Sequence, residues 1–256
     1  MHTLTSHRLD PFGVELHTNS LEELLSVGIK QLVVDHQLLL IRGIAPLSGK
    51  AFLEFVETLA GGRSGLLKWD FGYLMELRTD PGKENYIFPQ ERVPLHWDGA
   101  FHNKVPSTLT FQCIKTRGEG GETNFCHTTN VWNQASKKER QILKHLIINL
   151  KAEKKAYYGG VVREKIVGTH PHTGKPILRF TEPVDSELNP VEVKLEGPQN
   201  PEDWITSLKE RLYESRNCYS HKWEVGDIVF ADNHALLHGR NAYKNASRLI
   251  HRVQLL

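Results

Sequence analysis

The chain has 256 residues, of which 39% are hydrophobic and 24% are charged, and this composition is typical of a globular protein rather than a disordered chain. Its 32 Lys and Arg residues nearly balance 30 Asp and Glu residues, so net charge gives no reason to expect a nucleic-acid or membrane partner. Its 3 Cys residues include no CxxC pair, which argues against a disulfide framework and a thiolate zinc site.

The N-terminal sequence has no signal-peptide pattern, and the longest apolar run, at 38–41, is too short to cross a bilayer. Together with the cysteine usage, this predicts a cytoplasmic protein. The length suits one large domain over residues 1–256, and the sequence leaves the oligomeric state open.

Four segments carry helix signals, and each follows a residue type that starts helices. Ser20, Ser48 and Ser136 are predicted N-caps, and Ser20 and Ser136 also have the Glu spacing of a capping box. Asn200 followed by a proline begins the fourth segment. The predicted apolar faces are Leu21, Leu24, Leu25 and Ile29; Phe52, Phe55, Val56 and Leu59, stopped by Gly61 and Gly62; Ile142, Leu143 and Leu146; and Trp204, Leu208 and Leu212.

Short apolar runs bounded by Gly, Pro or Asn predict strands. They are HQLLLIRG (36–43), STLTFQCI (107–114), IINLKAEKKAY (147–157), PILRF (176–180), KWEVGDIVFAD (222–232) and RLIHRVQLL (248–256). Helices do not follow these runs regularly, so the predicted fold class is mainly β with flanking helices, a double-sheet sandwich or jelly roll. The proline- and charge-rich stretch from Glu182 to Glu202 is predicted to be a loop or lid.

The stretch VPLHWDGAF (93–101) places a histidine and an aspartate two positions apart. In an extended chain alternate side chains share a face, so His96 and Asp98 point one way and Trp97 the other. With 14 His in the chain about one such spacing is expected by chance, and without a further motif a hydrogen-bonded surface or core pair is the favoured interpretation.

A second segment, VGDIVFADNHALLHGRNAY (225–243), has the pattern of a turn, an apolar strand, another turn and then His238. A strand that returns across a sandwich can bring this histidine to the distant HxD pair. Two His and one carboxylate on one side of an iron leave the opposite positions open, as non-haem Fe(II) oxygenases require.

The C-terminal run SRLIHRVQLL places Arg248 and Arg252 four apart, with Ile250 between them on the same strand face. Two inward guanidinium groups need anions, and a dicarboxylate cosubstrate supplies them, because the planar fork of Arg matches a carboxylate. Thr123 follows a glycine-rich turn in GEGGETNF, where its hydroxyl can reach the far carboxylate of the same molecule.

Together these motifs resemble the taurine dioxygenase/TfdA family of Fe(II)- and 2-oxoglutarate-dependent oxygenases, over roughly residues 30–256. The resemblance implies a double-stranded β-helix and an iron triad of His96, Asp98 and His238. It also implies that the enzyme uses Fe(II), 2-oxoglutarate and O2 on a small-molecule substrate. Because the related halogenases lack the carboxylate ligand, Asp98 implies hydroxylation or desaturation instead.

The same resemblance assigns the cosubstrate contacts. Thr123 and Arg248 are expected to bind the distal carboxylate of 2-oxoglutarate. Arg252 is expected to face either the proximal carboxylate or an acidic group of the substrate.

Four stretches, KWDFGYLMELR, NYIFPQERVPLHWDGAFH, ILRFTEPVD and FADNHALLHGRNAY, resemble the branch of this family that works beside isonitrile synthases, the paerucumarin and rhabduscin type. This resemblance implies an isonitrile derived from an aromatic amino acid, oxidised by desaturation with or without loss of its carboxylate. A hydroxylase of a free amino acid or a sulfonate stays open as the alternative.

Several side chains are candidates for substrate contact. Arg179 lies inside the apolar run ILRF, where a charge is costly unless paired, so a substrate carboxylate or an acid such as Glu182 is expected beside it. Six further residues could line a pocket for an aromatic substrate, although residues of these types more often belong to the ordinary core or surface. They are Lys68, Trp69, Phe71, Tyr73, Tyr86 and Trp97.

Other histidines in the chain also have spacings that occur in metal sites. His234 and His238 have the spacing of a helical metal pair, but the preceding IVFADN predicts strand and turn. His170 and His172 flank a proline and are expected in a surface turn with a structural role. A zinc hydrolase or a non-catalytic metal-binding module is the more distant alternative, and the arginine pair argues against it.

Overall fold

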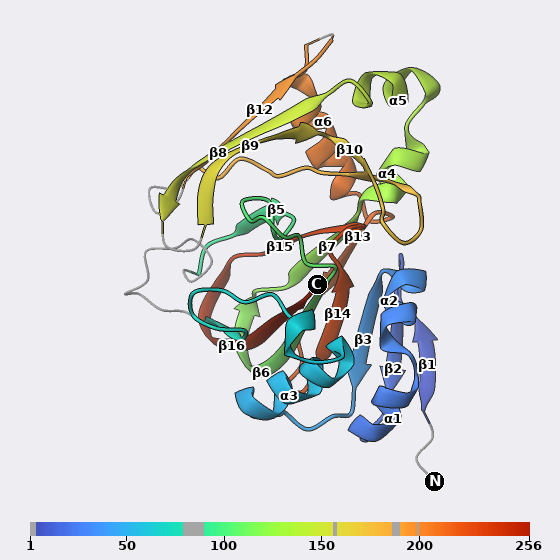
Figure 1. The fold of residues 1–256 in the computed structure, drawn as a ribbon, viewed down its shortest axis with the longest axis vertical. Helices are drawn as coiled ribbons and strands as arrows, with labels where there is room; N and C mark the ends of the chain where they lie inside the picture. Colours follow the sequence, from blue (N-terminus) through green and yellow to red (C-terminus); the bar gives the residue numbers. More distant parts are fainter. Residues whose placement is uncertain (1–3, 79–89, 156–157, 186–189, 199) are drawn as a thin grey trace.

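Two facing sheets organise the computed structural model, which describes residues 4–78, 90–155, 158–185, 190–198 and 200–256 (Figure 1). In spatial order, the larger sheet contains β1 (Thr5–Arg8), β2 (Val14–His17), β3 (Leu38–Arg42), β14 (Ile228–Asp232), β6 (Thr108–Gly120), β16 (Tyr243–Leu255) and β4 (Met75–Arg78). The smaller sheet contains β13 (Cys218–His221), β7 (Thr123–His127), β15 (Leu236–Arg240) and β5 (Val93–His96). The predicted mainly β architecture is confirmed.

The central strands of the larger sheet are buried on both faces, which explains their unbroken apolar sequences. In β3, Leu38 and Leu40 belong to the cluster between the two sheets, whereas Leu39 and Ile41 belong to the cluster under the helices. In β14, Val229 likewise belongs to the cluster between the sheets, whereas Ile228 and Phe230 belong to the cluster under the helices. Side chains alternate along a strand, so one apolar run supplies two cores.

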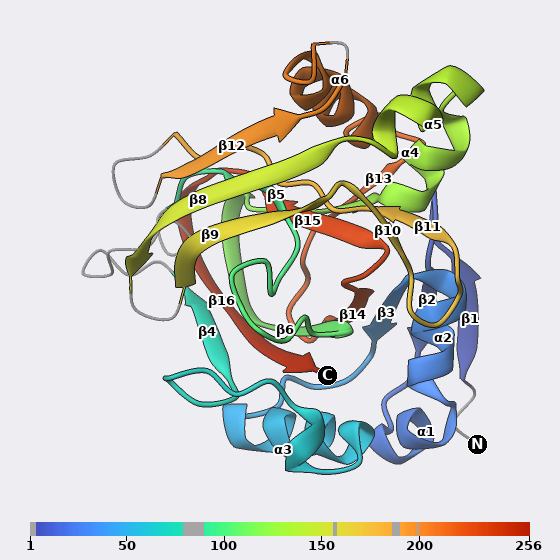
Figure 2. The same ribbon diagram turned by 45° about the horizontal axis from the view of Figure 1, so that its top comes forward.

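Three helices cover the outer face of the larger sheet: α1 (Leu21–Ser26), α2 (Ile29–His36) and α3 (Gly49–Ala60) (Figure 2). Ser20 and Ser48 cap α1 and α3 as predicted, accepting hydrogen bonds from the backbone of Glu23 and Ala51. The first predicted helix, however, is interrupted before Ile29, because Gly28 has a φ of 68° and separates α1 from α2. None of the described helices has both the length and the apolar character needed to span a bilayer.

An outer layer covers the other side of the smaller sheet (Figures 1 and 2). It contains the three-stranded sheet of β12 (Val191–Glu196), β8 (Ile147–Lys155) and β9 (Tyr158–Lys165), the hairpin of β10 (Val167–Thr169) and β11 (Pro176–Leu178), and the helices α4 (Thr128–Gln134), α5 (Lys137–Leu143) and α6 (Asp203–Leu212). A short 3-10 helix, η1 (Arg63–Gly65), follows α3. The predicted capping box is present at Ser136.

The prediction of a loop or lid from Glu182 to Glu202 is wrong for its middle part. Strand β12 lies there and pairs with β8 along its whole length. Val191, Val193 and Leu195 are buried while the intervening residues are exposed. Charged residues at every second position obscured this strand in the sequence, although such alternation is typical of a half-buried strand.

Candidate active site

Three side chains that could hold a metal ion meet on the inner face of the smaller sheet. His96 ends β5, Asp98 follows in the next turn, and His238 lies on β15, where it is the Cα partner of His96. One ligand atom from each lies within 4.8 Å of the other two. The Nε2 atoms of His96 and His238 lie 3.6 Å and 3.9 Å from Asp98 Oδ1. Strand pairing therefore brings the distant HxD and LHGR motifs together.

The protonation states at this cluster fit a divalent metal. Burial lowers the pKa of His238 to about 3, which keeps the imidazole neutral. Burial opposes ionisation of Asp98, but the charge of Arg252 and the contacts with both histidines hold its pKa far below the usual range. Nδ1 of His96 lies 2.9 Å from the carbonyl of Pro94, which can only accept, so Nε2 is left for a metal. Two imidazoles and one carboxylate are the donor set of non-haem Fe(II) oxygenases.

The main chain of Asp98 is fixed by Asn233, in the turn between β14 and β15. The Asp98 N–H donates to Asn233 Oδ1 at 3.0 Å, and Asn233 Nδ2 donates to the carbonyls of Asp98 at 2.9 Å and Pro106 at 2.8 Å. Asn233 is 1% exposed, so these bonds do not compete with solvent. The sequence interpretation did not identify this residue.

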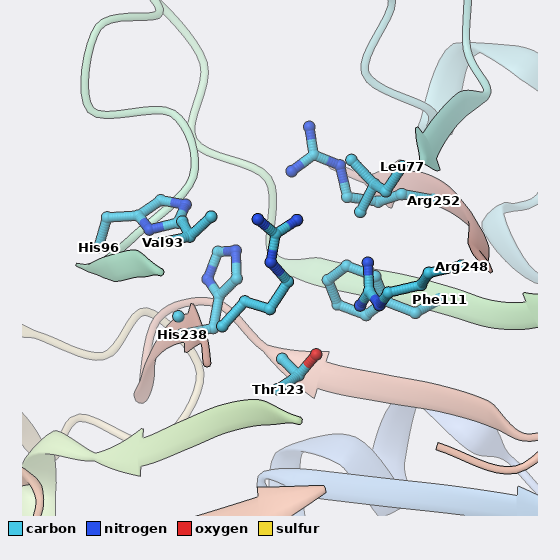
Figure 3. A pocket seen from close by; sticks show the side chains of 10 residues that line it. Leu77, Val93, His96, Phe111, Thr123, His238, Arg248 and Arg252 are labelled. Carbon is cyan, nitrogen blue, oxygen red and sulfur yellow. The ribbon is translucent and has the colours of Figure 1, made fainter. Parts of the chain in front are cut away.

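A cavity of about 430 Å³, including the part open to solvent, begins at the two histidines (Figure 3). The polar side chains in its lining are His96, His238, Thr123, Arg240, Arg248 and Arg252. Figure 3 shows the two imidazoles toward one end and Arg248, with Thr123 near it, toward the other.

The end of the cavity away from the histidines is strongly cationic. Burial, reinforced by the neighbouring charge of Arg240, lowers the pKa of Arg248 to about 10, and the group stays protonated at neutral pH. Within the described ranges, Arg248 Nε has no hydrogen-bond partner. Arg240 Nη2 donates to the carbonyl of Glu91 at 2.7 Å, and its guanidinium lies over the Tyr243 ring. Buried cations of this kind are stabilised by an anion.

Thr123 is oriented by the indole of Trp223, which donates from Nε1 to Thr123 Oγ1 at 2.9 Å. Because an indole N–H can only donate, the hydroxyl is the acceptor in this bond and can give its own hydrogen to a ligand in the cavity. Thr123, Arg248 and Arg252, all singled out in the sequence, thus lie around one cavity.

Arg252 already has a carboxylate partner within the protein. Its Nη1 donates to Asp98 Oδ2 at 2.9 Å, and its Nη2 lies 3.2 Å from the sulfur of Met75. The side chain nevertheless forms part of the cavity wall. Arg240 and Gln254 were missed by the sequence interpretation, although each lies two residues after a predicted site residue, His238 and Arg252, and so shares its strand face.

Arg179 is not paired with Glu182, but the charges of two other acids, Glu164 and Asp232, act on its guanidinium, so the expectation of a nearby acid is met by different residues. Arg179 donates to the carbonyl of Asn233 at 3.2 Å and to Nδ1 of His234 at 3.0 Å, and its guanidinium lies 5.8 Å from the Trp97 ring centre. Glu182 instead accepts hydrogen bonds from Arg92 and Tyr213. Arg179 is outside the set of described residues that line the cavity.

The structure places the predicted aromatic pocket residues in different environments. Lys68 is exposed, Tyr73 packs against the core under the helices, and Trp97 is buried between the smaller sheet and the outer layer. The cavity lining, as far as the described residues form it, contains none of the three. Trp97 faces away from His96, as expected for neighbours in an extended chain. Tyr86 lies outside the described residues.

Trp69 and Phe71 form a stacked pair whose ring centres are 6.2 Å apart. The indole of Trp69 also lies 5.1 Å from the ring of His102.

The remaining predictions about histidines have different outcomes. His238 lies on a strand and His234 in the turn before it, so the two are not a helical pair. His170 is 3% exposed and lies 2.7 Å from Asp232, so its placement in a surface turn is wrong and its structural role is confirmed. His172 is exposed.

Comparisons with known proteins extend these observations. The profile of the family described as "Taurine catabolism dioxygenase TauD, TfdA family" matches residues 4–254. The chain is 38% identical over 262 residues to 3-((Z)-2-isocyanoethenyl)-1H-indole synthase of Fischerella ambigua, covering 97% of this chain and 94% of that protein. It is 34% identical over 256 residues to tyrosine isonitrile desaturase of Pseudomonas aeruginosa, covering 96% and 86%.

Among solved structures, the fold is similar to PvcB, described as an Fe, alpha-ketoglutarate dependent oxygenase from an isonitrile synthetic pathway. The TM-score is 0.80 at 29% identity, over 99% of this chain and 91% of that one. A taurine dioxygenase from Burkholderia xenovorans shares the fold, with a TM-score of 0.72 at 17% identity over 98% and 89% of the two chains.

Proposed function

Because the chain belongs to the taurine catabolism dioxygenase TauD, TfdA family, we propose that it desaturates an isonitrile derived from an aromatic amino acid, with loss of the carboxylate. The chain is an oxygenase that depends on Fe(II) and 2-oxoglutarate and acts on a small molecule. The name of the relative from Fischerella ambigua describes an isocyanoethenyl indole, which has an alkene and no carboxylate. The name of the relative from Pseudomonas aeruginosa describes a desaturase.

The reaction balances with one equivalent of cosubstrate. The substrate loses hydrogen from its β carbon and CO2 from its α carbon, and the electron pair released forms the carbon–carbon double bond. Oxidative decarboxylation of 2-oxoglutarate to succinate and CO2 uses one oxygen atom of O2. The other oxygen atom leaves as water with the substrate hydrogen and a proton.

The observation that carries the proposal is the joining of two features in one cavity: a His, Asp, His cluster and a buried cationic end. His96, Asp98 and His238 would hold Fe(II), which supplies the activation of O2 when bound. The far carboxylate of 2-oxoglutarate binds Arg248 and the hydroxyl of Thr123. These contacts orient the cosubstrate so that its keto acid end faces the histidines.

Arg252 is placed to serve both the metal site and the cosubstrate site. It holds the outer oxygen of Asp98 and borders the cavity, so it is also placed to meet either the near carboxylate of the cosubstrate or the carboxylate of the substrate. The apolar walls supplied by Leu77, Val93 and Phe111 keep water away from the reacting atoms. We further propose that residues 1–256 act as one catalytic domain, which the family match over residues 4–254 supports.

The test is an anaerobic titration of the protein with Fe(II) and then 2-oxoglutarate, followed by turnover with O2. We expect the visible charge-transfer band of a bound keto acid, and then succinate release together with alkene formation from tyrosine or tryptophan isonitrile. Free tyrosine, free tryptophan and taurine are the comparison substrates. Metal-loaded protein without the band contradicts cosubstrate binding, and succinate release coupled only to an amino acid or to taurine contradicts the isonitrile substrate.

A further inference from the structure

The two oxygens of the Asp98 carboxylate have different surroundings. Oδ1 faces the Nε2 atoms of His96 and His238 at 3.6 Å and 3.9 Å. Oδ2 accepts hydrogen bonds from Arg252 Nη1 at 2.9 Å and from Gln254 Nε2 at 2.5 Å. Both donors come from β16 and hold Oδ2 away from the histidines. The carboxylate therefore presents one oxygen to a metal and has the other occupied by the protein.

Gln254 is itself oriented by a second hydrogen bond. The indole Nε1–H of Trp69 donates to Gln254 Oε1 at 2.5 Å. An indole N–H cannot accept, so this contact requires the amide oxygen of Gln254 on the Trp69 side and its NH2 group on the Asp98 side. Gln254 is 2% exposed, and its backbone carbonyl accepts from the N–H of Leu67 at 2.9 Å.

Trp69 is held in place by a tight turn. Its N–H donates to the carbonyl of Gly72 at 2.8 Å, and the Gly72 N–H donates back to the carbonyl of Trp69 at 2.9 Å. Gly72 has a φ of 109°, which favours glycine at this position. The rings of Phe71 and His102 lie against the indole. The indole N–H that orients Gln254 thus belongs to a residue whose backbone and ring both have contacts that hold them in place.

We infer that Gln254 is a positioning residue for the metal ligand Asp98, and that Trp69 sets the orientation of the Gln254 amide. The inference rests on the proposed function, since it requires a metal at Asp98. Hydrogen bonds to Oδ2 of Asp98 keep Oδ1 directed at the metal position before a metal binds. Loss of such an outer partner typically weakens metal binding by about 10–100-fold.

The experiment measures Co(II) binding by calorimetry and by its visible spectrum, without cosubstrate or substrate. In Gln254→Leu the amide is replaced by an apolar group, and we expect Co(II) affinity to fall about tenfold, with an altered Co(II) spectrum. In Trp69→Phe the ring remains but the N–H is lost, so the fall is a few-fold. The matched control is Trp204→Phe on α6, for which no change is expected. This tryptophan is half-buried and lies outside the hydrogen-bonded series Trp69, Gln254 and Asp98.

Thermal melting and circular dichroism establish that each variant is folded. A folded Gln254→Leu protein with the Co(II) affinity and spectrum of the wild type overturns the inference. If Gln254→Leu does not fold, Trp69→Phe is the deciding variant. Unchanged Co(II) binding in Trp69→Phe contradicts the proposal that Trp69 and Gln254 position Asp98. A wild-type protein that binds no Co(II) at all counts against the proposed function instead.

Discussion

The two ends of the cavity are supported in different ways. At the histidine end, the protein itself supplies partners: Asn233 bonds to the main chain of Asp98, and Arg252 and Gln254 bond to its carboxylate. At the other end, the buried guanidinium groups of Arg248 and Arg240 repel each other, and Arg248 Nε lacks a hydrogen-bond partner in the described part of the chain.

This difference indicates which end is complete without a ligand. The carboxylate of Asp98 is already compensated by a buried arginine, so its orientation does not depend on a metal. At the cationic end, an entering anion would instead lower the electrostatic cost of burying the Arg248 charge. We therefore expect metal affinity to depend on many supporting residues, and cosubstrate affinity to depend on a few charged contacts.

The largest effect tests whether the histidine end is the metal site. In His96→Ala or His238→Ala one ligand is lost, and we expect turnover to fall by more than about a hundredfold, beyond the usual effect of a supporting residue. Bound iron after anaerobic loading and gel filtration is the second measurement. His172→Ala, an exposed histidine, is the control. Near-normal iron content in both ligand variants contradicts the assignment.

Replacement of Arg248 tests the cationic end directly. In Arg248→Met the proposed charged partner of the cosubstrate is lost, and charged hydrogen bonds of about 1.5–3 kcal/mol correspond to roughly a 10–150-fold weaker binding of 2-oxoglutarate. The melting temperature of the ligand-free protein should not fall, because a buried charge is replaced by an apolar chain of similar length.

Titration of the charge-transfer band with 2-oxoglutarate measures the first effect, and calorimetric melting measures the second. Arg117→Met, on the exposed part of β6, is the matched control. Full activity of Arg248→Met at low 2-oxoglutarate contradicts the cosubstrate contact. A large loss of stability in the ligand-free variant contradicts the idea that this end is complete only with an anion.

Local sequence patterns predicted much of the fold because their causes are local. Ser48 and Ser136 cap helices through bonds that span three residues, and β3 follows from an apolar run between turn residues. The facing directions of His96 and Trp97 follow from alternation along an extended chain. Strand β12 was missed because the charged side chains at its exposed positions hid its buried ones.

The candidate site was less accessible to sequence reasoning. No local rule pairs β15 with β5, so the proximity of His238 and His96 came from resemblance to a family rather than from spacing. The side chains that support Asp98 are distant in sequence, and their roles depend on which strands become neighbours. The proposed contacts of Tyr73 and Trp97 with substrate had only residue type to support them, and both residues pack in cores.

A smaller effect is expected where support at the histidine end comes from the main chain. Asn233→Asp keeps the acceptor for the Asp98 N–H but places an oxygen against the carbonyls of Asp98 and Pro106. A buried polar group left unsatisfied costs about 1–3 kcal/mol. We expect the melting temperature to fall by roughly 2–10 °C and Co(II) affinity to fall by about tenfold. Asn133→Asp, at an exposed position of α4, is the control, and unchanged Co(II) affinity contradicts the positioning of Asp98 by Asn233.

The smallest effect concerns how Thr123 contributes at the cationic end. Trp223→Phe removes the indole N–H that occupies the Thr123 oxygen, so the hydroxyl is free to rotate away from the cosubstrate. One neutral hydrogen bond is worth about 1 kcal/mol, so the 2-oxoglutarate concentration at half saturation should rise about fivefold while kcat at saturation is unchanged. Trp132→Phe, a tryptophan buried in the core between the smaller sheet and the outer layer, should have no such effect.

The combination with Thr123→Val separates orientation of the hydroxyl from packing. If Trp223 acts through the hydroxyl, its loss adds nothing once that hydroxyl is gone, and the double variant should bind 2-oxoglutarate as Thr123→Val does. Trp223 also contacts the rings of Phe111 and His221, so an effect through packing would persist in the double variant. Additive losses would therefore assign Trp223 to the core, and Arg248 would remain as the residue on which the anion depends.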